Sequence, residues 1–160
     1  MGNCISAARI IPNTDDENQT EERVVAAGID DQKYARMVLN ITLNKIGVYT
    51  NSGKFIQGKN EEEINNFTKF IMSMKIKPTC IFLDQNLDSN GKPFKKGTEL
   101  IRQLKKMKYE GCLIIRSSDN SPEDISEYLA AGAHGVIPKH IIDPAEFVSM
   151  MNQIMRKVKK

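Results

Sequence analysis

The chain has 160 residues, which fits one domain with a substantial hydrophobic core. Hydrophobic residues make up 40% of the chain and charged residues 27%, an ordinary globular composition, and no apolar run approaches the roughly 20 residues of a membrane helix. The net charge of +3 comes from basic residues spread along the chain, so we expect no nucleic-acid partner.

The amino terminus, MGNCIS, matches the pattern for N-myristoylation of Gly2, and Cys4 is available for palmitoylation. One myristoyl chain binds a membrane only marginally, so stable anchoring would also require an acyl group on Cys4. The alternative is that residues 2–12 are the tail of a preceding domain in a longer protein. We therefore expect a cytoplasmic protein that associates with membranes only if this terminus is acylated.

The segment NTDDENQTEE, at residues 13–22, is acidic and lacks hydrophobic periodicity, and an apolar run begins at Val24. We predict an extension or linker at residues 1–22 and one folded domain at residues 23–160. Within this domain, short apolar runs alternate with helical segments. The predicted strands are residues 24–29, 48–56, 79–83, 112–115 and 135–137.

A helix is predicted after each strand. In the first, residues 32–46, one face of an amphipathic pattern consists of Tyr34, Met37, Val38, Ile41 and Ile46. The second begins with Asn60 and Glu63 at capping-box spacing, and the third spans residues 98–108. The last two begin at Ser121-Pro122 and Asp143-Pro144, where a capping residue precedes a proline at the first helical position.

This alternation of short apolar strands and helices predicts a parallel sheet covered on both faces. Right-handed crossovers then limit the fold class to a doubly wound α/β sandwich of three layers. Such sheets bind ligands beyond the carboxyl ends of their strands, so the residues that follow each strand are the candidate site.

Two of the three cysteines, Cys80 and Cys112, lie in predicted strands, and the third is Cys4. Their odd number and the absence of a CxxC pair argue against a disulfide framework and a zinc site. We expect a reducing compartment, with Cys80 and Cys112 as buried thiols.

Five polar residues follow four of the strands: Asp30 and Asp31 the first, Asp84 the third, Ser117 the fourth and Lys139 the fifth. Taken singly, Asp31 could cap a helix, Ser117 could be a loop hydroxyl and Lys139 a solvated amine. Together they indicate a site, because two like charges 4 Å apart repel by about 4 kcal/mol at an effective dielectric of 20. A lysine and a hard cation such as Mg²⁺ would offset that repulsion.

A carboxylate nucleophile, an acidic metal pair, a hydroxyl and a cation are the groups that phosphoryl transfer to an aspartate requires. Four of five segments contain these groups; in chain order, the five are VVAAGIDD, CIFLDQNL, GTELIRQLKK, CLIIRSSD and AAGAHGVIPK. With these segments, residues 23–157 resemble the receiver domain of two-component response regulators. The resemblance implies a flavodoxin-like (CheY-like) (βα)5 fold with a five-stranded parallel sheet in the order 2-1-3-4-5.

The resemblance also implies a role for each matched residue. Asp84 would be the phosphoacceptor, and Asp30, Asp31, Asp84 and Asn86 would bind Mg²⁺, Asn86 through its backbone carbonyl. Ser117 would turn toward the phosphoryl group, and Lys139 would contact one of its oxygens. Asn86 and Asp119 would flank the path of the attacking water.

The chain departs from the receiver pattern in three places. Val136 stands three residues before Lys139, where many receivers have Tyr or Phe. Pro138 precedes the lysine, whereas the usual proline follows it. The connection from Asp84 to Gly97 is longer than usual, and it could cover the site, meet a partner or be a solvated insertion.

The function that the sequence predicts is a phosphoacceptor module, whose partner is a histidine kinase or a histidine phosphotransfer protein. It would not be an enzyme in the ordinary sense, because it would catalyse only phosphoryl transfer to its own Asp84 and the hydrolysis that follows. The alternative is a receiver-like scaffold that binds a partner without phosphorylation. An aspartate-nucleophile phosphatase would need an acidic residue at position 86, where this chain has Asn86. An EF-hand calcium loop counted from Asn86 would need Glu at its twelfth position, where this chain has Gly97.

Overall fold

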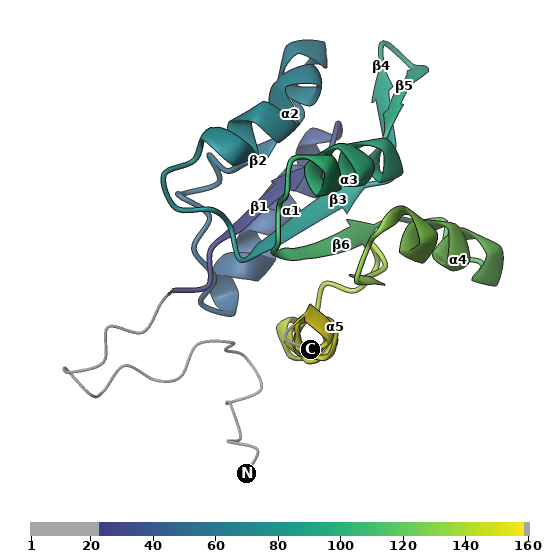
Figure 1. Cartoon of the computed structure of the whole chain (residues 1–160). Helices are drawn as coiled ribbons and strands as arrows, with labels where there is room; N and C mark the ends of the chain where they lie inside the picture. The colour runs from purple at the N-terminus through teal and green to yellow at the C-terminus, as the bar shows by residue number, and fades with distance from the viewer. Residues whose placement is uncertain (1–22, 159–160) are drawn as a thin grey trace.

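The computed structural model describes residues 23–158. The predicted acylation sites Gly2 and Cys4, and the predicted extension, lie outside these residues. In chain order, the elements are β1 (Ala26–Ile29), α1 (Lys33–Lys45), β2 (Ile56–Gln57), α2 (Glu61–Ser73), β3 (Cys80–Asp84), β4 (Asn86–Ser89), β5 (Lys92–Lys96), α3 (Gly97–Lys106), β6 (Cys112–Arg116), α4 (Pro122–Ala131), β7 (Gly135–Val136) and α5 (Pro144–Val158), and Figure 1 shows their arrangement.

The main sheet has five parallel strands in the order β2-β1-β3-β6-β7. Numbered without the hairpin strands β4 and β5, this is the predicted order 2-1-3-4-5, so the predicted fold class is confirmed. One hydrophobic cluster joins the sheet to α1 and α5, and a second joins its other face to α2, α3 and α4. The three layers follow from strands that are buried on both faces.

Three of the predicted helix starts form the expected caps. The side chain of Asn60 accepts a hydrogen bond from the amide of Glu63 at 2.9 Å, at the start of α2. Ser121 caps α4 in the same way, and Asp143 accepts from the amide of Glu146 at the start of α5. These caps satisfy backbone donors that have no partner within their helices, so local sequence fixes where these helices begin.

The packing of α1 differs from the prediction. Three of the apolar residues expected on one face are solvent-exposed: Tyr34 by 77%, Met37 by 52% and Ile41 by 50%. The residues that pack on the sheet include Leu39 and Leu43 instead, on another side of the helix. Because α1 has apolar residues on two sides, periodicity alone could not show which side contacts the sheet.

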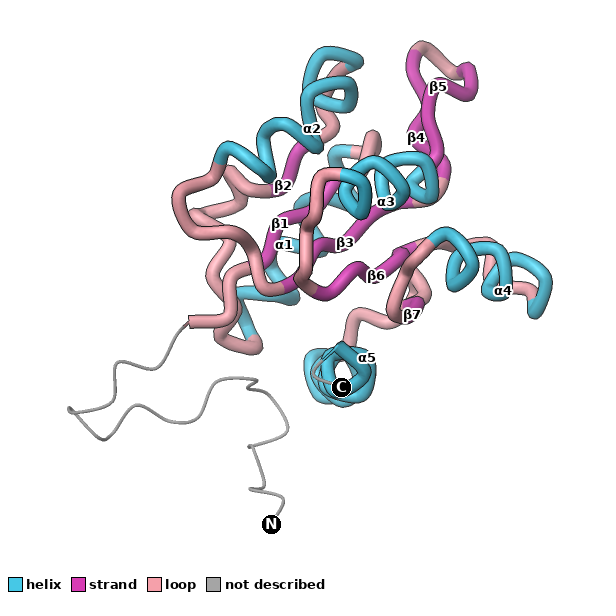
Figure 2. Tube along the Cα trace, in the orientation of Figure 1, coloured by secondary structure: helices cyan, strands magenta, loops and turns pink. Residues whose placement is uncertain are grey.

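The connection after Asp84 forms a second, two-stranded sheet, for which the sequence predicted no strands. Strands β4 and β5 pair antiparallel around Asn90 and Gly91, which have φ values of 54° and 73°. Asn-Gly favours such a left-handed pair of turn residues in a tight hairpin. The side chain of Leu87 is fully buried and anchors the base of the hairpin, whereas the tip projects away from the main sheet, past α3 (Figure 2). The strands went unrecognised because most of their residues are polar.

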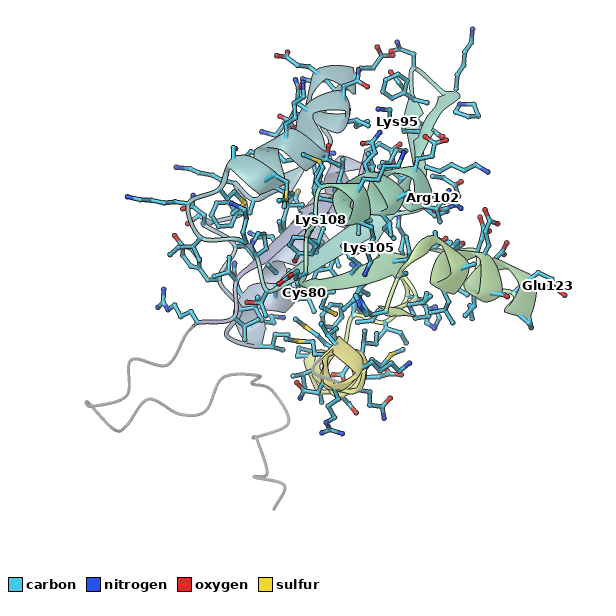
Figure 3. The ribbon with its side chains drawn as sticks, in the orientation of Figure 1. Cys80, Lys95, Arg102, Lys105, Lys108 and Glu123 are labelled. Carbon is cyan, nitrogen blue, oxygen red and sulfur yellow. The ribbon has the colours of Figure 1, made fainter. Side chains whose placement is uncertain are left out.

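The two cysteines in the described residues are buried thiols, as predicted. Cys80 and Cys112 are neighbours in the pairing of β3 with β6, and neither forms a disulfide. Cys80 lies at the start of β3, inside the domain (Figure 3), and burial raises the pKa of its thiol. Among the helices of residues 23–158, none is long and apolar enough to cross a membrane.

Candidate phosphoacceptor site

The carboxyl ends of the central strands bring the predicted acidic residues together. Asp30 follows β1 directly and Asp84 is the last residue of β3, and both are 5% exposed. Carboxylate oxygens of Asp30, Asp31 and Asp84 all lie within 4.8 Å of one another. The helix-cap alternative for Asp31 does not hold, because Gln32 is the residue that precedes α1.

Lys139, in the loop after β7, completes this cluster. Its ammonium nitrogen lies 2.9 Å from Asp30 Oδ2 and 3.1 Å from Asp84 Oδ1. Its backbone amide donates to the carbonyl oxygen of Ser117, which fixes the loop against the end of β6. Lys139 is therefore no solvated surface amine: it bridges two buried carboxylates at the end of the sheet.

Two glycines allow the backbone to close around these acids. A Cβ atom at Gly97 would collide with the carbonyl oxygen of Asp84, so only glycine lets α3 begin this close to the end of β3. Gly58 has φ +121°, and a Cβ there would collide with the carbonyl oxygen of Asp30. The positions of both carboxylates thus depend on close backbone contacts.

Burial and the neighbouring carboxylate of Asp30 raise the pKa of Asp84 to about 8, and Lys139 only partly opposes this effect. The pKa of Lys139 is also raised. Burial alone would lower it, but the carboxylates of Asp84 and Asp30 outweigh burial. Without a further cation, Asp84 therefore carries a proton at neutral pH for most of the time.

Sequence reasoning missed Arg116, the last residue of β6. Its side chain is 5% exposed, its Nη2 donates to the carbonyl oxygen of Lys139 at 3.2 Å, and its guanidinium lies 5.6 Å from the ring centroid of Phe147. Arg116 is thus a second buried cation at the site, and it holds the backbone of Lys139. A charged residue at the end of the apolar strand CLIIR was the available signal.

Ser117 is buried beside this cluster, and its neighbourhood contains the residues predicted to control hydrolysis. The hydroxyl of Ser117 accepts a hydrogen bond from the amide of Asp119 at 3.0 Å. The side-chain nitrogen of Asn86 donates to Asp119 Oδ2 at 3.3 Å. The structure thus brings together Asn86 and Asp119, which are distant in sequence, at the exposed mouth of the site.

The donor set fits a hard divalent cation. Three carboxylates within reach of one point supply only oxygen ligands, which suit Mg²⁺ and not a soft metal. The raised pKa of Asp84 reflects the same excess of negative charge, which a cation would relieve. That the backbone carbonyl of Asn86 is a further ligand stays a prediction.

The fold is shared with solved receiver domains of response regulators. The BeF3-activated receiver domain of DrrB is 18% identical with a TM-score of 0.60, over 84% of this chain and 99% of that one. A LuxR-family response regulator from Aurantimonas sp. is 18% identical with a TM-score of 0.64, over 85% and 87% of the two chains. The chemotaxis protein CheY4 of Vibrio cholerae is 17% identical with a TM-score of 0.62, over 83% and 99%.

At these identities the likeness establishes the fold: the chain has the fold of a response-regulator receiver domain. No protein-family model matches the chain, and neither does any curated protein.

Proposed function

We propose that this domain is a phosphoacceptor, which takes a phosphoryl group on Asp84 from a phosphohistidine of a histidine kinase or phosphotransfer protein. The observation that carries this proposal is the convergence of Asp30, Asp31 and Asp84 on Lys139 at the carboxyl edge of the sheet. No other group of three potential metal ligands occurs in residues 23–158.

In the proposed reaction, a carboxylate oxygen of Asp84 attacks the phosphorus atom. The new O–P bond forms as the P–N bond to the donor imidazole breaks, and the electron pair of that bond stays on the imidazole nitrogen. Lys139 supplies positive charge against the transferring group, and Ser117 supplies a hydroxyl for one of its oxygens. Later, water attacks the acyl phosphate, which regenerates the carboxylate and releases inorganic phosphate.

Asp30, Asp31 and Asp84 would hold the Mg²⁺ ion, which when bound neutralises charge on the carboxylates and on the phosphoryl oxygens. Only ionised Asp84 is nucleophilic, and its pKa of about 8 keeps it protonated at neutral pH. A cation bound to the three acids favours the ionised form, so the proposed cofactor also activates the nucleophile.

The exposed side of α1 is a candidate contact surface for a protein partner beside this site. Tyr34, Met37 and Ile41 form an apolar stripe along the helix, which starts two residues after Asp31. Apolar side chains spaced along one helix face suit packing against another helix. We propose that the phosphohistidine donor contacts this stripe while it presents its phosphoryl group to Asp84.

The experiment compares three proteins: wild type, Asp84→Asn and the control Asp88→Asn, in which the changed residue is an exposed carboxylate on the hairpin. Each is incubated with Mg²⁺ and a small acyl phosphate, and its intact mass is measured. Wild type and Asp88→Asn should gain one acid-labile phosphoryl group, and Asp84→Asn should gain none. Equal labelling of Asp84→Asn, or no labelling of wild type, would refute the proposal.

The second candidate is a scaffold that keeps the fold without phosphorylation, and it is favoured by Val136 at the position where many receivers have an aromatic residue. Beryllofluoride, an analogue of the bound phosphoryl group, separates the two candidates. With Mg²⁺ it should shift the amide resonances around Ser117 and Lys139 if the phosphoacceptor proposal is right. A scaffold would show unchanged spectra.

A further inference from the structure

The hydroxyl group of Ser117 has a second hydrogen-bond partner inside the domain. Tyr128, on α4, is 2% exposed, and its hydroxyl oxygen lies 3.3 Å from Ser117 Oγ. The same hydroxyl lies 2.7 Å from the carbonyl oxygen of Asp119. Tyr128 therefore connects three parts of the structure: the residue predicted to contact the phosphoryl group, the loop after β6, and α4.

The number of hydrogens fixes the direction of these bonds. A phenol has one hydrogen, and the carbonyl oxygen of Asp119 is both the nearer acceptor and one that cannot donate. With the phenol hydrogen on the carbonyl oxygen of Asp119, the hydrogen that fills the 3.3 Å contact is that of Ser117, whose Oγ also accepts from the amide of Asp119. In this arrangement, the hydroxyl of Ser117 accepts from the loop after β6 and is bonded to Tyr128 on α4.

The ring of Tyr128 belongs to the hydrophobic cluster between the sheet and α4, α3 and α2. A side chain packed this way has little freedom to follow Ser117. If Ser117 turns toward a phosphoryl oxygen, it gives up its bond to the phenol, and the buried phenol oxygen loses its donor. The hydrogen bond between Ser117 and Tyr128 therefore opposes this rotation of the Ser117 side chain.

We infer that Tyr128 is a positioning residue: it holds the Ser117 hydroxyl in the orientation of the unphosphorylated domain and links that orientation to α4. The side chain of the half-buried Val136 has no polar group, so it cannot form such a hydrogen bond with Ser117. This inference rests on the proposed function, because it concerns how the same site responds to a phosphoryl group. It goes beyond that function by assigning the control of Ser117 to a residue on α4.

The variant Tyr128→Phe removes the hydroxyl and keeps the ring. A hydrogen bond contributes about twofold to tenfold to such an equilibrium, and at 3.3 Å this one belongs in the lower half of that range. Beryllofluoride with Mg²⁺ should therefore bind Tyr128→Phe about two- to fivefold more tightly than wild type, as measured by titration of amide resonances. A role limited to packing would leave the affinity unchanged or weaken it.

Tyr109→Phe is the matched control. Tyr109 is also buried, and its hydroxyl donates to the carbonyl oxygen of Pro78 at 2.8 Å, near the amino-terminal ends of the strands. This variant loses a buried phenol hydroxyl away from the site, so its beryllofluoride affinity should equal that of wild type. In a Ser117→Ala background, the further change Tyr128→Phe should no longer increase the affinity.

A second measurement tests the inference without any phosphoryl analogue. In the free wild-type protein, three-bond couplings of Ser117 should report one χ1 rotamer, and in Tyr128→Phe they should report averaging over rotamers. Unchanged couplings together with unchanged beryllofluoride affinity would overturn the inference. Wild type that fails to bind beryllofluoride would instead refute the proposed function, and the couplings would still decide the role of Tyr128.

Discussion

The buried carboxyl of Asp84 should make the stability of the metal-free domain fall as pH rises. Its pKa is 3.8 in an unfolded chain and about 8 in the fold. Above pH 3.8 the unfolded state therefore binds fewer protons than the folded state, and the free energy of unfolding falls with increasing pH. The slope is at most about 1.4 kcal/mol per pH unit, and it vanishes above pH 8, where both states are ionised.

Between pH 5 and pH 7 this proton linkage costs about 2 to 3 kcal/mol, a substantial share of the roughly 5 to 15 kcal/mol that stabilises a domain. Asp84→Asn cannot ionise, so the difference in free energy of unfolding between wild type and Asp84→Asn isolates the contribution of Asp84. Because the chain has no tryptophan, urea unfolding in a chelating buffer would be followed by far-ultraviolet circular dichroism.

From pH 5 to pH 7, the free energy of unfolding of Asp84→Asn should rise by about 2 to 3 kcal/mol relative to that of wild type. The free energy of unfolding of Asp88→Asn should change with pH as that of wild type does. Mg²⁺ should restore stability to wild type, and the apparent Mg²⁺ affinity should rise about tenfold per pH unit below pH 8, because the metal displaces one proton. A difference that stays constant from pH 5 to pH 7 would refute the argument that burial and Asp30 keep Asp84 protonated.

Lys139→Met removes the ammonium group that contacts Asp30 and Asp84, so Mg²⁺-dependent phosphorylation should slow about a hundredfold; a rate within threefold of wild type would contradict its role. Gly97→Ala should lower the free energy of unfolding in urea by about 1 to 3 kcal/mol more than Gly91→Ala, because a Cβ at Gly97 collides with the backbone of Asp84, whereas one at Gly91 meets no atom within 4 Å and adds only the strain of its positive φ. Met37→Glu should slow phosphoryl transfer from a phosphohistidine protein about tenfold by burying a charge and leave labelling by a small acyl phosphate unchanged; equal slowing with both donors would exclude α1 as the docking face.

Local patterns were sufficient to predict a doubly wound parallel sheet and the cluster of acids at its edge, whereas the strand order followed from the resemblance to receiver domains. Short apolar strands that end at Asp30 and Asp84 show where the carboxyl edge lies, and alternation with helices sets the topology. Helix caps such as Asn60 are equally local. Which side of α1 packs on the sheet depends on the shape of the sheet surface, and Tyr34 and Met37 show that an apolar pattern can also mark an exposed face.

The parts of the site that escaped prediction depend on contacts between distant segments. Tyr128 lies eleven residues after Ser117, and in sequence it is an ordinary apolar residue of an amphipathic helix. The hairpin escaped for another reason: its Leu87 is buried against the domain, but its other residues are mostly polar, so the signal for strands was weak. In each case the decisive contact exists only once the sheet has brought its strands together.

The charges of the site explain why Asp84 is protonated in the metal-free domain and how phosphorylation would be accommodated. Three carboxylates face two buried cations, Lys139 and Arg116, which leaves one excess negative charge when Asp84 is ionised. Protonation of Asp84 removes this excess, in agreement with its pKa of about 8. A phosphoryl group of about −2 on Asp84 replaces the charge of that carboxylate, and a bound divalent cation then brings the set of charges back to zero.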